Sequence, residues 1–122
     1  MGLPADLLIN IAGALQGTEY DGPVYSANTE QLNVNLLRLA DGASIPQHIN
    51  DEVDVLVVVL QGTCKLIVDN EMTVLRPSMA AIIPRGRLRA LRCTMGPLVY
   101  LTCHRRRAPL MPTVPSKAHV SV

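Results

Sequence analysis

The uninterrupted apolar run from Val55 to Leu60, with the sequence VLVVVL, constrains the fold more than any other stretch of the chain. All six residues are β-branched or Leu, and the run is too short for a typical helix. Because successive side chains of a strand point to opposite sides, a strand made of these residues is apolar on both faces. The run therefore predicts a fully buried strand in the middle of a sheet.

The segments around this run predict further strands. Between Leu32 and Leu39, apolar residues alternate with Asn33 and Asn35, which is typical of a half-buried strand. We expect residues 61–63 to turn the chain out of the central strand and Asp69-Asn70 to close a hairpin within residues 64–75. Residues 98–103 predict a last strand. Short strands at this spacing, without long helical segments between them, favour a barrel or sandwich over a parallel sheet.

The N-terminal segment predicts a short helix. Apolar residues at 7, 8, 11 and 15 follow helical spacing, and Pro4 suits a first helical turn. Gly13 weakens this prediction, so an irregular arm packed on the barrel is the alternative. The dipeptide Val24-Tyr25 predicts a short edge strand.

Composition and length set the class of protein. A chain of 122 residues has room for one domain, and its core must be built without Phe or Trp. Cys64, Cys93 and Cys103 form no CxxC pair, and no secretory signal precedes them, so we expect a reducing, cytoplasmic setting. The longest apolar run, six residues, is far below the roughly twenty that cross a bilayer, so we expect a soluble protein without a membrane partner.

Charge is distributed unevenly along the chain. All ten acidic residues lie within residues 1–71 beside only Arg38 and Lys65, and nine Lys and Arg follow. We expect the two halves to neutralise each other within one small barrel. The basic run from Arg105 to Arg107 has no interleaved aromatic residues, so it does not indicate nucleic-acid binding.

Two groups of residues resemble the motifs of a known family. Gly42, His48, Asn50 and Gly62 follow the first motif of the cupin superfamily, which is Gly, five residues, His-x-His, three or four residues, Glu, then Gly. Pro84-Arg85-Gly86 matches Pro-x-Gly of the second motif, which places Ser78 at its first Gly, Arg89 at its His and Cys93 at its Asn.

The chain thus resembles a small single-domain cupin of the RmlC-like superfamily. The resemblance implies an all-β fold, an antiparallel jelly-roll barrel with a short N-terminal helix or arm. The arm and edge strand are expected in residues 1–30, the barrel core in 31–104, and a basic, Pro-containing tail in 105–122.

The resemblance also implies a degenerate metal site. Cupins usually bind a divalent metal ion through two His and the Glu of the first motif and the His of the second. Here His48 matches the first His, but Asn50 and Arg89 stand at two other His positions, and Arg cannot ligate a cation. The Glu position falls on Asp54 counted forward from Asn50, or on Val55 counted back from Gly62. We therefore expect at most a weakly bound divalent ion, held by His48 and Asp54.

These substitutions favour a protein that binds a small molecule without catalysis. We expect His48, Asn50, Asp54 and Arg89 to form the ligand site and to hold a small anionic molecule at the barrel mouth. Arg89 is predicted to point inward and to pair with Asp54 or Glu52, and the alternative is a shifted strand that leaves it in solvent.

Two other functions stay open at this stage. One is a metal-dependent enzyme of the isomerase or dioxygenase type with a rearranged site, and the other is a dimerising structural module. A homodimer is expected in any case, because the apolar strands exceed what one small barrel can bury. His104 and His119 have no partners at metal spacing, and Cys93 and Cys103 are interpreted as small buried hydrophobic residues.

Overall fold

The computed structural model describes residues 2–16 and 21–106, which form two short helical turns and seven strands. The helical elements are η1 (Ala5–Leu7) and α1 (Ile11–Leu15). The strands are β1 (Gly22–Asn28), β2 (Leu32–Leu39), β3 (Ser44–Ile49), β4 (Val55–Val68), β5 (Glu71–Leu75), β6 (Ala80–Ile83) and β7 (Leu88–Arg105). No helix within these ranges is long and apolar enough to cross a membrane.

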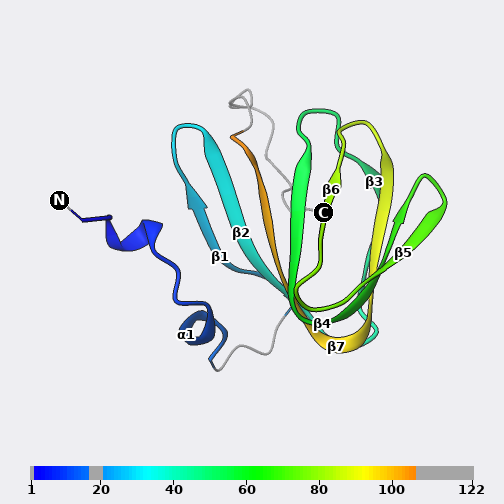
Figure 1. The fold of residues 1–122 in the computed structure, drawn as a ribbon, viewed down its shortest axis with the longest axis horizontal. Coiled ribbons are helices and arrows are strands. Elements are labelled where there is room, and N and C mark those ends of the chain that lie inside the picture. Colours follow the sequence, from blue (N-terminus) through cyan, green and yellow to red (C-terminus); the bar gives the residue numbers. More distant parts are fainter. Residues whose placement is uncertain (1, 17–20, 107–122) are drawn as a thin grey trace.

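The strands form an antiparallel barrel around β4 and β7 (Figure 1). They pair in the order β1-β2-β7-β4-β5, with β3 on β7 and β6 on β4, and every pair is antiparallel. β4 and β7 bend at the lower end of the barrel in Figure 1 and pair with each other along most of their length. The all-β, antiparallel jelly-roll fold with a short N-terminal helix is therefore confirmed.

β4 and β7 are longer than predicted. The predicted turn at residues 61–63 is wrong, because β4 continues through it as one strand of 14 residues. Its register against β7 shifts on both sides of Gln61 and again between Thr63 and Cys64, so the chain bulges and bends here without leaving the sheet. Gly62 permits the bend because its φ of 80° lies in the left-handed region. The hairpin at Asp69-Asn70 is confirmed, with both residues at positive φ.

The N-terminal arm is less regular than a single helix. Residues 8–10 interrupt it, and α1 begins after Asn10, whose side chain accepts a hydrogen bond from the Gly13 N–H at 3.0 Å. The Tyr25 hydroxyl donates to the Asp6 carbonyl and so ties the arm to β1. β1 is an edge strand as predicted, but it is seven residues long.

The core is aliphatic apart from two cysteines and one tyrosine. Its buried members are Leu37, Leu39, Ile45, Val53, Val55, Val57, Val59, Cys64, Leu66, Leu75, Ile83, Leu91, Cys93, Leu98 and Tyr100. Along β2 the core residues Leu37 and Leu39 share a face with Asn33 and Asn35, because strand side chains alternate with period two. The polar side of this half-buried strand therefore faces the barrel interior, and Val34 lies on the outer face.

Of the predicted tail, only Arg105 and Arg106 are described, and Arg105 still belongs to β7. Arg107, His119 and the prolines of the tail lie outside the described residues.

Candidate functional site at the barrel mouth

One end of the barrel, the upper end in Figure 1, gathers the β3–β4 loop, the β6–β7 turn and the end of β7. The Gly86 N–H donates to the Asn50 carbonyl at 2.7 Å, which joins the loop to the turn. The Arg105 guanidinium donates to the Glu52 carbonyl at 2.8 Å, which joins the loop to the strand end. We call this end the barrel mouth, formed by residues 50–54, 84–89 and 104–105.

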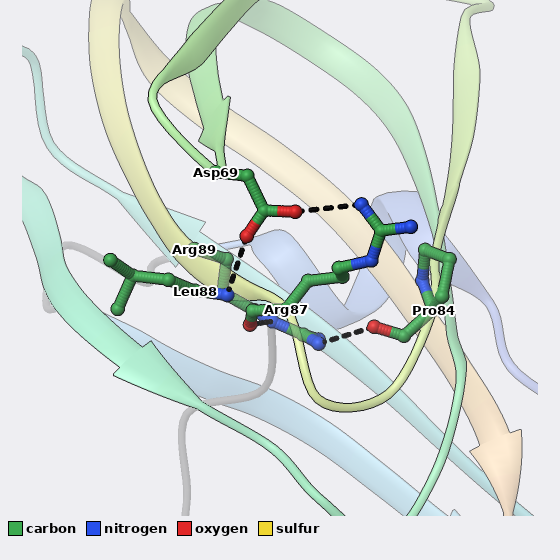
Figure 2. Close-up of polar contacts among 5 residues, drawn as sticks. All are labelled: Asp69, Pro84, Arg87, Leu88 and Arg89. Atoms are coloured by element: carbon green, nitrogen blue, oxygen red, sulfur yellow. Dashed lines mark hydrogen bonds and ion pairs between the residues drawn. The ribbon is translucent and has the colours of Figure 1, made fainter.

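Arg89 is completely buried at the barrel mouth, with 0% of its surface exposed. Its Nε donates to the Arg87 carbonyl at 3.1 Å and its Nη2 to the Pro84 carbonyl at 2.8 Å (Figure 2). The predicted inward orientation is confirmed, and the predicted pairing with Asp54 or Glu52 stays a prediction. The turn that precedes β7 brings two of its own carbonyl oxygens to the guanidinium.

His48 lies beside Arg89. The two residues are direct partners in the antiparallel β3–β7 ladder, so their side chains share a face. His48 is half-buried, and its Nδ1 lies 3.0 Å from the Pro46 carbonyl oxygen. An imidazole and a guanidinium therefore stand next to each other at the barrel mouth.

Asn50 and Asp54, the other two predicted ligand residues, stabilise the backbone of the mouth. The Asn50 Oδ1 accepts hydrogen bonds from the N–H groups of Glu52 and Val53, at 3.0 and 3.3 Å. The Asp54 carboxylate accepts from the Arg85 N–H at 2.8 Å and is exposed. Val55 is 0% exposed and belongs to the core, so of the two candidates for the motif Glu position it is the one that points inward.

These donors do not fit a divalent metal ion. Within residues 2–16 and 21–106, no three His, Cys, Asp or Glu side chains lie close enough together to hold one. The Asn50 Oδ1 already caps a turn, Asp54 faces outward, and a permanent cation stands at the second-motif position. Within the described residues, His48 and Asp54 therefore belong to no group of three such ligands.

A polar cluster on the inner face of β7 was missed by the sequence analysis. Thr102 is 0% and His104 is 7% exposed, and they pair across the ladder with Asn35 and Asn33. The Asn35 Nδ2 donates to the Asn33 Oδ1 at 2.6 Å and lies 3.3 Å from the Thr102 Oγ1. The alternation of Tyr100, Thr102 and His104 with apolar residues was the available signal, because alternate residues of a strand share one face.

The rim of the mouth carries charges of both signs. A cavity of about 410 Å³ is lined by Glu52, Val53, Asp54, Arg85 and Arg105. On the neighbouring hairpin, Asp69 accepts hydrogen bonds from the Arg87 Nη1 at 2.6 Å and from the Leu88 N–H at 3.2 Å (Figure 2). The hydrogen bond from Arg87 lowers the pKa of Asp69 below its ordinary value, and the Arg89 charge acts in the same direction.

Comparison with known proteins agrees with the fold. A family model described as a cupin domain matches residues 35–103. A double-stranded β-helix protein from Klebsiella pneumoniae superposes with a TM-score of 0.71 at 13% identity, covering 86% of this chain and 91% of that one. A cupin superfamily protein from Desulfitobacterium hafniense superposes with a TM-score of 0.66 at 21% identity, covering 84% and 94%.

A third similar structure is described as a sugar phosphate isomerase from a cupin superfamily, from Silicibacter pomeroyi. It superposes with a TM-score of 0.57 at 28% identity, covering 62% of this chain and 51% of that one. No curated protein matches the sequence.

Proposed function

Because the chain belongs to the cupin family, we propose that its barrel serves as a binding site for a small anionic molecule, held by fixed cationic and polar side chains instead of a metal ion. The observation that carries the proposal is the complete burial of Arg89 at the barrel mouth. Two of its hydrogen bonds, to the carbonyl oxygens of Arg87 and Pro84, orient the guanidinium.

Electrostatics favours an anion at this position. A charge in the barrel interior is screened less than a charge in water, so a guanidinium there attracts an anion more strongly. His48, which neighbours Arg89 in the ladder, adds a ring that can donate a hydrogen bond. Planar carboxylate and phosphate groups match the guanidinium, which can bind them through two parallel hydrogen bonds.

One of the similar structures gives a reason to include phosphate among the probes. The Silicibacter pomeroyi protein is described as a sugar phosphate isomerase, and a sugar phosphate is a small anion. The described donors of this chain do not favour metal-dependent isomerase or dioxygenase chemistry, because no metal-ligand group assembles among them.

Calorimetric titration with inorganic phosphate and with malonate tests the proposal. We expect binding of at least one anion, and Arg89→Leu should weaken it at least about tenfold, roughly 1.4 kcal/mol. Arg92→Leu is the matched control, since Arg92 lies on the same strand, is exposed and removes the same charge. It should change the affinity by less than about twofold, because exposed charges are screened.

A second variant keeps the proposal testable even if Arg89→Leu does not fold. His104→Gln keeps a polar side chain at the inner end of β7 and should also weaken anion binding if the interior is the site. Circular dichroism should show unchanged strand content in each variant. Anion binding that is equally strong in Arg89→Leu and the parent protein, or no binding of either anion, contradicts the proposal.

We also propose a homodimer that forms through the outer face of the sheet. Cross-strand partners place five apolar residues in one row on that face: Ala27, Val34, Cys103, Leu56 and Ile82. Leu56 is 37% and Ile82 is 72% exposed, and an apolar row of this length is typical of an interaction surface. All three cysteines are free thiols, which suits the reducing cytoplasm that we propose as the location.

A further inference from the structure

Two of the three cysteines face each other in the core. Cys64 on β4 and Cys93 on β7 are direct cross-strand partners, and both are 0% exposed. Both are free thiols. Cys103 is also on β7, but it belongs to the outer apolar row and pairs with Leu56. The chain therefore holds one buried thiol pair and one separate thiol on the opposite face of the sheet.

The main-chain hydrogen bonds fix the geometry of this pair. The Cys93 N–H donates to the Ala43 carbonyl at 2.8 Å, and the Cys93 carbonyl accepts from the Gly42 N–H at 3.0 Å. Both groups of Cys93 thus point away from β4, which makes Cys64 and Cys93 a non-hydrogen-bonded pair. Such pairs have Cα atoms about 4.5 Å apart. Disulfides bridge Cα separations of about 4.4–6.8 Å, so this pair lies within the range that a disulfide accepts.

We propose that Cys64 and Cys93 are a modification site, at which a small peroxide converts the two thiols into an intramolecular disulfide. One thiolate sulfur attacks the O–O bond of hydrogen peroxide, forms a sulfenic acid and releases hydroxide. The second thiolate attacks the sulfenic sulfur, forms the S–S bond and releases a second hydroxide. The two thiol protons convert both hydroxides to water, and the two electrons lost by the sulfurs reduce the peroxide.

The link would act on the strand that carries the candidate binding site. Cys93, Leu91 and Arg89 share one face of β7 and are partners of Cys64, Leu66 and Val68 on β4. The register of β4 shifts immediately before Cys64. A covalent link at this point fixes the pairing of the two strands beside the bulge, four residue pairs along the ladder from Arg89.

Burial makes the reaction slow at neutral pH. It raises the pKa of the Cys64 thiol from 9.0 to about 11, and it also raises the pKa of Cys93. Cys93 acts in the same direction on the pKa of Cys64, and the Leu75 N–H from β5 lowers it. Asp41 raises the pKa of Cys93, and Cys64 raises the pKa of Tyr100 on β7. The thiolate is the reactive form, so the rate should rise about tenfold per pH unit up to about pH 11.

Peptide mapping of the peroxide-treated full chain tests the proposal. In a Cys103→Ser background, we expect a linked peptide pair that contains residues 64 and 93, a mass lower by two hydrogen atoms, and reversal by dithiothreitol. Adding Cys93→Ala should abolish the linked pair. Peroxide-treated protein in which both thiols stay reduced, or reach the sulfinic acid without linking, overturns the proposal.

The unfolding of the linked protein gives a second readout that needs no core variant. A link formed at native geometry should keep the circular dichroism spectrum and raise the urea midpoint, because it restricts the unfolded chain. A lower midpoint would mean that the two strands must distort to accept the bond, and it would overturn the geometric argument.

Discussion

Arg89 shows how far a single residue can be predicted from a motif. The spacing from Pro84-Arg85-Gly86 correctly indicates that the residue points inward. It does not indicate that two carbonyl oxygens of the turn itself accept hydrogen bonds from the guanidinium. A carbonyl partner depends on how the turn curls beneath the strand, and the side-chain pattern carries no information about that.

Arg89→Leu should lower the free energy of unfolding by about 1–3 kcal/mol, since it removes a buried side chain and its hydrogen bonds to the Pro84 and Arg87 carbonyl groups. Urea denaturation measures the loss. The exposed Arg92→Leu should stay within about 0.5 kcal/mol of the parent protein. Equal stability of both variants would show that the two carbonyl bonds contribute nothing net.

At the scale of the elements, the strands were predictable because hydrophobic periodicity and turn residues are local signals. The bounds of β2 and the hairpin after β4 follow from them directly. Which face of β2 points inward was not predictable, because a period of two defines two faces without saying which meets the core. Asn33 and Asn35 lie on the same face of the sheet as their partners on β7, His104 and Thr102. This pairing joins segments that are far apart in the sequence, so local patterns do not reveal it.

The candidate site, too, was predictable only in part. The motif spacing correctly indicates that His48 and Arg89 lie next to each other. His48 is identified by its distance along the chain from Gly42, and Arg89 by its distance from Pro84-Arg85-Gly86. The ambiguity between Asp54 and Val55 could not be resolved from spacing alone. Only the alternation of buried residues along β4 places Val55 inside and Asp54 outside.

Gly62 tests the bulge that bends β4. A Cβ there would lie 2.5 Å from the Pro97 carbonyl oxygen and 2.7 Å from the Met95 carbonyl oxygen, and the φ of 80° is strained for any other residue. Gly62→Ala should therefore destabilise the fold by about 3 kcal/mol or more, measured by thermal or urea unfolding.

Gly42→Ala is the control for Gly62→Ala. Its φ of 79° is nearly the same, but a Cβ at Gly42 meets no atom within 4 Å. Gly42→Ala should lower the free energy of unfolding by only about 1–2 kcal/mol, which is the cost of a left-handed φ for a residue other than glycine. Equal losses in the two variants would mean that steric contact with residues 95–98 is unimportant and that the bend depends on φ alone.

At the scale of the whole molecule, the barrel combines a partly polar interior with an apolar outer row. The inner face of β2 and β7 carries Asn33, Asn35, Thr102 and His104, whereas Val34 and Cys103 face outward. A water-facing sheet normally has the opposite arrangement, with polar residues outside. This arrangement is consistent with a barrel that binds a polar ligand inside and a second copy of the chain outside.

The homodimer can be tested at the centre and at the end of the outer apolar row. Light scattering should give about twice the chain mass of 13.2 kDa, and Ile82→Lys should shift the protein to monomer. Ile82 is the exposed end of the row, and loss of a well-packed apolar contact there costs about 2 kcal/mol or more, roughly thirtyfold in Kd. Met72→Lys is the matched control: Met72 is 56% exposed but lies on β5, outside the row, so this variant should remain dimeric.

Cys103 supplies an independent measurement on the same surface. It lies in the middle of the row, between Val34 and Leu56, so a two-fold axis near the row brings the two copies of Cys103 close together. A short bis-maleimide should then cross-link the parent protein and Met72→Lys but not Ile82→Lys at the same concentration. A parent chain that scatters as 13.2 kDa at every concentration, without cross-linking, would mean that the apolar row faces water and that the dimer proposal is wrong.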